Sequence, residues 1–438
     1  MGGRRNQSFA VDTRMLLVRG VAAARAGEVG EARRYLEQLL RAEHEPEEFA
    51  EACLWLSRIS DDPAEKRHYL EEILARRPGE PRARRDLAIL DGRLSPDQIV
   101  DPDRLAAADA TTQEAEARRY TCPRCAARMV FTPDGEALYC EHCGYGQTPE
   151  QSGETAERDF IVTMARAEGH RQPVALLSFQ CDGCAASFML APNTLSLTCP
   201  YCDATYSLGH GAAEELIPPD GIVPFRMDEA AAQKRVDRWL REQKLRGRAL
   251  VHPLYLPVWT FDVGGAIRWS GYRQARQSRG PADPQETFLA PEREEGDYAI
   301  LLDDFPVAAC ETLPAALHPL LQGFDFDAVT PFQPDYLANW PAQTYEIAVG
   351  DASLAARREA FRRHEKKVRL SLERLQQVRL SPAHIDVYSY KLVLLPLWLA
   401  HYGDGGKRYA VAVNGQTGEV AGETPPASLG RRLSRLFG

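Results

Sequence analysis

The sequence contains the same arrangement of four cysteines twice, and this duplication constrains the fold more than any other feature. Residues 122–143 and 181–202 each hold two C-x2-C pairs separated by fourteen residues. Two such turns joined by a β-hairpin supply four sulfur ligands at tetrahedral angles. The spacing therefore predicts two metal sites. The first set of ligands is Cys122, Cys125, Cys140 and Cys143, and the second set is Cys181, Cys184, Cys199 and Cys202.

We expect zinc at both sites, two ions per chain, in a purely structural role. Four thiolates leave no open coordination position for a substrate. A module of this size buries too little apolar surface to fold alone, and structural zinc supplies about 10–16 kcal/mol of apparent binding free energy. Replacing any ligand with Ser is expected to unfold its module. Disulfides, a thioredoxin-like redox pair and an iron–sulfur cluster are the alternatives to zinc.

The N-terminal region, residues 1–95, predicts an all-α helical repeat. RRYLEQLL at 33–40 recurs as RHYLEEIL at 67–74, a shift of 34 residues that is typical of stacked helical pairs. Proline and glycine positions place the helices at 12–26, 29–43, 46–59, 62–76 and 80–91. Residues 96–118, rich in Asp and Ala, predict a linker.

Residues 12–91 resemble tetratricopeptide repeats. The resemblance is carried by Ala24, Ala32, Tyr35, Trp55, Leu56, Tyr69, Leu70 and Pro78. It implies that the helices hold a peptide or another protein in a concave groove. A short helical stalk that only supports the rest of the chain is the plainer interpretation.

The cysteine modules, at 119–150 and 178–212, look like small β zinc ribbons. An amphipathic helix within the connecting segment 151–177 is expected to pack them together. The second ribbon has no Lys or Arg between residues 178 and 210, and a zinc ion with four thiolates adds a formal charge of about −2. Such a surface repels phosphate, so protein contact is favoured over nucleic acid.

The C-terminal region, residues 213–424, predicts an α+β domain with two Pro-x-Trp strand hairpins. LYLPVW at 254–259 and VLLPLW at 393–398 each precede a second strand after a glycine turn, placed at Gly264–Gly265 and at 403–406. Each proline is expected at the edge or entry of a strand. A further strand is expected near 343–349.

Residues 120–424 resemble bacterial zinc-ribbon proteins of the transcription-factor-IIB-type, also labelled primosomal-helicase-like. The resemblance rests on IVPF at 222–225, the two Pro-x-Trp strands, and Val413–Gly418 within the closing hairpin. It implies a bacterial protein linked to envelope stress. It does not imply helicase activity, because the G-x4-G-K-[ST] phosphate loop is absent from the sequence. Members often continue into membrane helices, whereas this sequence continues into a basic amphipathic tail, 425–438, which is a candidate for peripheral membrane contact.

A long helix over 353–379 has nine basic and three acidic residues between Leu354 and Leu380. Its predicted apolar stripe repeats every seven residues through Leu354, Phe361, Val368 and Leu375. The partner-binding candidates are Arg362, Arg363, Lys366 and Lys367. They suit an acidic protein, a phosphate backbone or a membrane surface, and a solvated helix face is the plainer interpretation.

The bulk composition narrows the function. A chain of 438 residues with 44% hydrophobic content and a net charge of −9 predicts about three soluble domains. We expect no transmembrane segment, no signal peptide and a cytoplasmic location. Since no catalytic motif is recognisable, the leading hypothesis is a non-enzymatic zinc-binding scaffold or adaptor whose protein partners the sequence does not identify. Nucleic-acid binding through helix 353–379 is the alternative.

Overall fold

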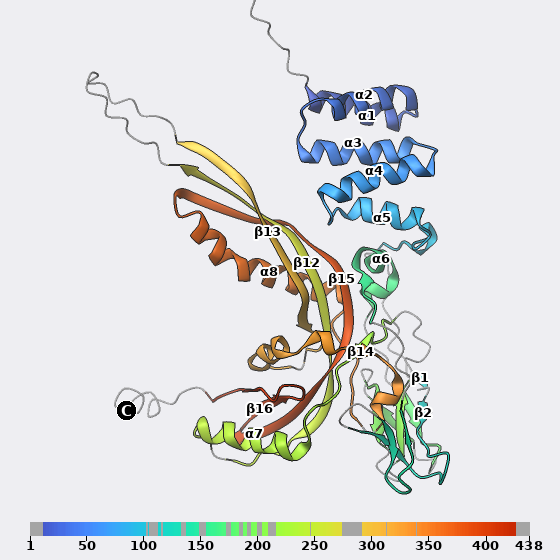
Figure 1. Cartoon of the computed structure of the whole chain (residues 1–438), viewed down its shortest axis with the longest axis vertical. Helices are drawn as coiled ribbons and strands as arrows, with labels where there is room; N and C mark the ends of the chain where they lie inside the picture. The colour runs from blue at the N-terminus through green and yellow to red at the C-terminus, as the bar shows by residue number, and fades with distance from the viewer. Residues whose placement is uncertain are drawn as a thin grey trace, which may run out of the picture.

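A computed structural model gives the architecture of the chain. It describes the sequence apart from residues 1–11, 102–103, 105–112, 115–116, 133–136, 149–154, 172–176, 184–186, 191–193, 199–203, 209–215, 246, 274–290, 312, 339 and 426–438. Three long, strongly curved strands form the central framework of an elongated molecule (Figure 1). The N-terminal helices stack beside the upper part of these strands, and the cysteine modules lie beside the lower part. The fold is therefore multidomain, with a helical N-terminal region and a large, mostly antiparallel C-terminal sheet.

The N-terminal region consists of five helices, as predicted. They are α1 (Thr13–Arg25), α2 (Val29–Arg41), α3 (Pro46–Ile59), α4 (Pro63–Arg76) and α5 (Pro81–Leu90). The last three begin with proline, whose missing N–H costs nothing in the first turn. Residues related by the shift of 34 are buried alike: Leu36 matches Leu70, and Leu39 matches Ile73. The sequence period is thus a period of packing.

The central sheet is built on β13 (Glu292–Ala308), β12 (His252–Arg273) and β15 (Leu375–Asp404), which are neighbours in that order. β11 (Gly221–Ile222) runs parallel to β15, and β14 (Thr330–Pro331) follows it. β16 (Lys407–Asn414) forms a hairpin with β15 and also pairs with β17 (Val420–Gly422). β6 (Arg158–Asp159) pairs with β15 as well. β13 is an edge strand of this central sheet.

The predicted turn at Gly264–Gly265 is wrong, because β12 runs straight through it and pairs with β13 instead. The glycines serve close approach between strands. A Cβ on Gly264 would lie 2.7 Å from the ring of Tyr388, and one on Gly265, at φ +114°, would lie 2.0 Å from the carbonyl oxygen of His384. No other residue fits at Gly265 without moving the backbone.

Both Pro-x-Trp prolines lie inside strands, at points where a neighbouring strand ends. Pro257 of β12 comes one residue before Val258, which is the first residue of β12 to pair with β13 and lies opposite Ala308. Pro396 of β15 falls between the end of the β11 pairing, at Leu394, and the start of the β16 pairing, at Leu397. Each missing N–H therefore costs no ladder hydrogen bond on that side.

The long basic helix is α8 (Val349–Ser371). It is shorter than predicted, and it buries a different face from the one that the heptad stripe predicts. Its buried face consists mainly of small residues, Ala352, Ala356 and Ala360, whereas Leu354 is 56% exposed. Small side chains let the helix axis approach the twisted strands closely. Leu375 already belongs to β15, so the predicted heptad stripe and the end at residue 379 are wrong.

The segment before α8 and the helix α7 complete the description of the C-terminal region. The predicted strand near 343–349 is absent, and α8 begins at its end. α7 (Glu229–Glu242) is capped by the Asp228 carboxylate, which accepts a hydrogen bond from the Ala231 N–H. A 3₁₀ segment, η4 (Ala315–Gly323), lies between β13 and α8 in the sequence. No helix in the described parts of the chain is long and apolar enough to cross a membrane.

The described parts of the cysteine modules form three small sheets. One consists of β3 (Met129–Phe131), β4 (Leu138–Cys140) and β5 (Gly146–Gln147). The others contain β7 (Leu177–Gln180) with β8 (Ser187–Leu190), and β9 (Ser196–Thr198) with β10 (Thr205–Leu208). β1 (Gln113–Glu114) joins β7, and β2 (Ala117–Arg119) joins β10. The predicted linker 96–118 is therefore wrong at its C-terminal end, which belongs to the second module.

The segment between the modules does not pack them together as predicted. It forms a short helix, α6 (Phe160–Met164), and a 3₁₀ turn, η3 (Ala167–His170). α6 packs instead between α5 and β15, with the Phe160 ring edge-on to Phe261 and Tyr390. Because it connects the helical array to the sheet, the two cysteine modules must join by other contacts.

Candidate metal centre

The first predicted ligand set converges in space. The Sγ atoms of Cys122, Cys125, Cys140 and Cys143 all lie within 4.8 Å of one another. Cys122 Sγ is 3.6 Å from Cys143 Sγ, and Cys125 Sγ is 3.5 Å from Cys140 Sγ. Tetrahedral coordination with metal–sulfur bonds of about 2.3 Å requires sulfurs about 3.8 Å apart. The cluster therefore has the size and shape to hold one metal ion.

The two turns that present these thiols have the same backbone hydrogen bonds. The Cys122 N–H donates to the Ala127 carbonyl at 2.8 Å, and the Ala126 N–H donates to the Cys122 carbonyl at 2.8 Å. The equivalent bonds around Cys140 join it to Tyr145 at 2.8 Å and to Gly144 at 3.0 Å. Ala126 and Gly144 both have a left-handed backbone, with φ of 59° and 70°. The C-x2-C motif thus encodes a local shape that positions each pair of sulfurs.

The electrostatics of the cluster favour a bound cation. The backbone N–H groups of Cys143 and then His142 hold the pKa of Cys140 down to about 6. The Ala127 N–H acts the same way on Cys125, but burial and the neighbouring thiols outweigh it and raise the pKa of Cys125 to about 12. Four thiolates so close together repel one another unless a positive ion lies between them. The donor set therefore fits a thiolate-binding metal.

The second ligand set lies largely outside the described residues. Cys184, Cys199 and Cys202 belong to parts of the chain that the structure does not describe. Cys181 is fully buried, and its Sγ lies 3.2 Å from the Tyr206 hydroxyl. The structure thus brings together one of the two predicted clusters.

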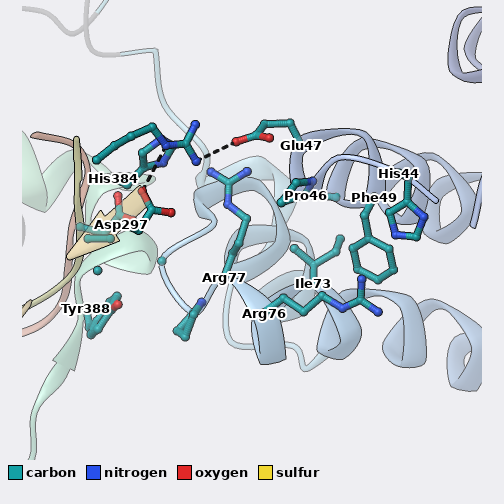
Figure 2. Close-up of a pocket in the computed structure, with 17 residues that line it drawn as sticks. His44, Pro46, Glu47, Phe49, Ile73, Arg76, Arg77, Asp297, His384 and Tyr388 are labelled. Atoms are coloured by element: carbon teal, nitrogen blue, oxygen red, sulfur yellow. Dashed lines mark hydrogen bonds and ion pairs between the residues drawn. The ribbon is translucent and has the colours of Figure 1, made fainter. Parts of the chain in front are cut away.

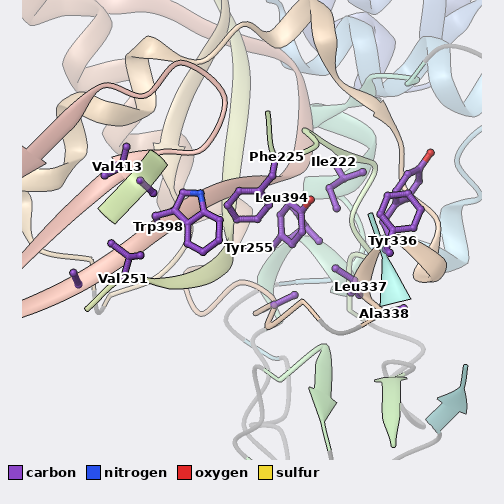
Figure 3. Close-up of a cluster of buried hydrophobic side chains, with 14 of the residues drawn as sticks. Ile222, Phe225, Val251, Tyr255, Tyr336, Leu337, Ala338, Leu394, Trp398 and Val413 are labelled. Carbon is purple, nitrogen blue, oxygen red and sulfur yellow. The ribbon is translucent and has the colours of Figure 1, made fainter. Parts of the chain in front are cut away.

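The four-cysteine cluster lies against the core of the central sheet. The Phe131 ring of β3 packs edge-on to Tyr336 at 4.7 Å. Its backbone N–H donates to the Ala338 carbonyl at 3.0 Å, and its carbonyl accepts from the Trp340 indole N–H at 2.9 Å. Trp340 in turn stacks on Phe225 of the cluster drawn in Figure 3. The hairpin closed by the thiols is therefore continuous with the sheet core.

The two cysteine modules are joined directly to each other. The Tyr120 hydroxyl, next to the first turn, is 2.7 Å from the Ser207 hydroxyl of β10. The Thr205 hydroxyl donates to the Met129 carbonyl at 3.2 Å. β2, which leads into the first module along the chain, pairs with β10 of the second module. Because of these contacts, we expect the two modules to unfold together rather than one at a time.

The partner-binding candidates on α8 differ in their contacts. Arg362 donates two hydrogen bonds to Glu359, at 2.6 and 2.7 Å. Arg363 lies 4.6 Å over the Phe305 ring and donates to the Gln322 side chain at 2.6 Å. Lys366 and Lys367 are exposed and make no ion pair within the described residues. The four side chains thus share one helix but do not form one site.

A cleft between the helical array and the sheet was not predicted. We call it the array cleft; it has a volume of about 560 Å³, and residues of α3, α4, β12, β13 and β15 line it (Figure 2). Arg268 of β12 spans it, with a nitrogen 3.4 Å from Glu47 and another 3.2 Å from Asp297. Nearby, Arg84 of α5 donates to the Tyr388 carbonyl at 2.8 Å. Its walls are about 200 residues apart in sequence, so no local pattern indicates it.

A second unpredicted feature is a charged cluster within the sheet. The Lys391 ammonium lies 2.8 Å from Asp304 and 3.4 Å from Glu157, and Asp262 accepts from the Ser389 hydroxyl. Burial lowers the pKa of Lys391, but its hydrogen bond to Asp304 and the nearby carboxylates outweigh it and raise the pKa. Asp303 and Asp304 both belong to β13. The cluster fastens β13 and residue 157 to β15.

The chain has a distant resemblance to a known protein. No protein-family model matches the chain, and no solved structure matches it. It is 24% identical to YdjG, an uncharacterized protein of Bacillus subtilis (strain 168), over 327 residues. The match covers 71% of this chain and 91% of YdjG. A match of that length extends beyond the cysteine modules into the sheet region.

Proposed function

We propose that the protein is a non-enzymatic scaffold that binds two zinc ions per chain and links protein partners. The observation that carries the proposal is the position of the four-thiol cluster, whose hairpin is packed into the core of the sheet through Phe131 and Trp340. Four sulfur ligands leave no coordination position for a substrate, so a metal ion there would have a structural role and would stabilise the hairpin.

The partner-binding part of the proposal rests on the helical array. Its two apolar clusters contain only residues between Leu16 and Leu87, so the array has a core of its own. The resemblance to tetratricopeptide repeats, with the period of 34 reflected in burial, supports a role in holding a peptide or protein. The resemblance to bacterial zinc-ribbon proteins extends the proposal to a link with envelope stress.

Quantitative affinity capture tests the adaptor role. We would compare partners recovered from host extract by the full chain and by a chain lacking residues 1–95. Both apolar clusters of the array lie within the removed segment, so the remaining sheet and metal site are expected to stay folded. Metal analysis and circular dichroism would verify this. The scaffold proposal expects one subset of partners to be lost and another retained. An unchanged set of partners would remove the array from the proposed function.

Nucleic-acid binding through α8 is the second candidate, and the exposed Lys366 and Lys367 favour it. It requires binding to DNA or RNA that weakens steeply as salt rises, because phosphate contacts release counterions. Charge reversal at Arg362, Arg363, Lys366 and Lys367 would abolish such binding. Absence of binding at low salt would eliminate this candidate.

A further inference from the structure

A groove runs along α8, away from both the metal centre and the array cleft. We call it the α8 groove; its volume is about 740 Å³. One wall is η4 and the other is α8. The floor is the C-terminal end of β13, an edge strand of the central sheet. The floor and walls are mainly apolar. The apolar lining includes Phe305, Val307, Leu313, Leu321, Ile347 and Ala355.

Arginine side chains line the α8 wall of this groove. Arg358, Arg362 and Arg363 contribute to the lining and outnumber its two carboxylates, those of Glu311 and Glu359. Arg358 is exposed and makes no ion pair with any part of the chain that the structure describes. Arg362 is 74% exposed although it is paired with Glu359. Arg358 and Arg362 are one helical turn apart, and Lys366 continues the row by another turn.

One arginine also holds the groove open. Arg363 lies over the Phe305 ring at 4.6 Å and donates to Gln322 of η4 at 2.6 Å. It thereby ties the helix, the floor and the opposite wall together with a cation–π contact and a hydrogen bond. A groove held in this way costs little reorganisation when a ligand enters.

We propose that the α8 groove binds an acidic amphipathic helix of a partner protein. Apolar side chains at i, i+3, i+4 and i+7 of that helix would enter the groove, and carboxylates on its flank would face Arg358 and Arg362. Helix-in-groove binding combines these two features, and the charge complementarity selects an acidic partner. The inference rests on the proposed scaffold function and gives it a second docking surface.

Other occupants fit the groove less well. A nucleic acid would use the arginines but would leave the apolar floor unused, and the net charge of −9 opposes it. The chain's own C-terminal segment carries Arg431, Arg432 and Arg435, which the arginine row would repel. An acidic helix uses both the floor and the row.

Fluorescence polarisation on the full-length, zinc-loaded chain tests the proposal. The probe is a synthetic fluorescein-labelled peptide of about 15 residues, or four helical turns, with Leu on one face and Glu on the flanks. A sequence isomer of the same composition, with the Leu stripe broken, is the reference peptide. The proposal expects the striped peptide to bind at least about tenfold more tightly, a difference of about 1.4 kcal/mol.

Two variants separate charge from shape. Arg358→Glu with Arg362→Glu reverses the rim, and Ala355→Trp fills the groove from an exposed helix position without changing the charge. Each should weaken the striped peptide by about tenfold or more. The matched control is Arg238→Glu with Arg241→Glu, two exposed arginines of α7, and it should change the affinity by less than about twofold.

Several results would overturn the proposal. Equal binding of the isomer, or an equal loss in the α7 control, would mean non-specific attraction between charges. Full competition by single-stranded DNA together with no effect of Ala355→Trp would mean a phosphate surface. Binding to phosphatidylglycerol vesicles without binding to the peptide would mean a membrane surface. If the peptide fails while capture still depends on residues 1–95, the groove proposal fails and the scaffold remains.

Discussion

Glu65 is the residue that joins two consecutive helical pairs of the array. Its carboxylate accepts hydrogen bonds from the Arg33 guanidinium of α2, one of them at 2.8 Å, and from the Ser60 hydroxyl. The Arg33 bond, and then the Ser60 bond, lower the pKa of Glu65 from 4.5 to about 2. Because the pKa is depressed in the folded state, the stabilisation is complete above about pH 4.5 and is lost as the pH falls towards about 2.

Glu65→Gln should therefore remove an acid-sensitive part of the array's stability. Near neutral pH we expect a loss of about 0.2–1 kcal/mol, the usual range for partly exposed pairs. As the pH falls from 4.5 towards 2, the difference between the wild-type and variant free energies of unfolding should shrink. Urea denaturation at several pH values, followed by circular dichroism, measures this difference. A difference that stays constant over that range would contradict the account.

At the scale of elements, α8 illustrates what a sequence pattern reveals and what it misses. Its existence follows from helix-forming residues, but its buried face does not follow from its largest apolar residues. Leu354 is 56% exposed, while Ala356 and Ala360 are fully buried. How closely the helix approaches the strands is a tertiary property, and it selects small residues at the contact. The turn predicted within β12 is wrong for the same reason. Its two adjacent glycines look like a turn in the sequence, but they leave room for Tyr388 and the His384 carbonyl.

The packing of α8 predicts that two substitutions differ strongly in their cost in stability. Ala360→Leu adds volume to a filled contact and should cost about 1–3 kcal/mol. Leu354→Ala removes an exposed side chain and should change stability by less than about 0.5 kcal/mol. Chemical denaturation of both variants measures the two values. A larger cost for Leu354→Ala would restore the heptad stripe predicted from the sequence.

The hairpin of β3 and β4 is the element that connects the four-cysteine cluster to the central sheet. Phe131→Ala removes the ring that packs on Tyr336 and should cost about 3–5 kcal/mol. Tyr139→Ala on the same hairpin is the control, because Tyr139 is 39% exposed and should cost far less. Guanidinium denaturation monitored by tryptophan fluorescence measures both. Equal, small costs would mean that the hairpin is not part of the sheet core.

At the scale of the whole molecule, the array is held against the sheet by few but close contacts. A Cβ on Gly79, in the loop between α4 and α5, would lie 2.2 Å from the Asp386 carboxylate of β15. These contacts join residues about 300 positions apart, so local sequence patterns do not predict them. The five helices and the first cysteine cluster, in contrast, follow from short-range periodicity and spacing.

Gly79→Leu should displace the array from the sheet without unfolding it. We expect an increased radius of gyration by small-angle X-ray scattering, with unchanged helicity by circular dichroism. Gly30→Leu in α2 is the matched control, because a Cβ there meets nothing within 4 Å. An unchanged scattering profile for Gly79→Leu would show that this loop does not set the position of the array.

The most direct measurement is hydrogen exchange of the full chain before and after the metal is removed with a chelator under reducing conditions. If a metal ion at Cys122, Cys125, Cys140 and Cys143 holds the hairpin in the sheet core, protection should fall in 129–131 and also in 336–338 and 340–342, which pack around Phe131. Protection in α1 to α5 should be unchanged, because the array has its own core. Full protection of 129–131, 336–338 and 340–342 in the metal-free chain would contradict the structural role assigned to this site.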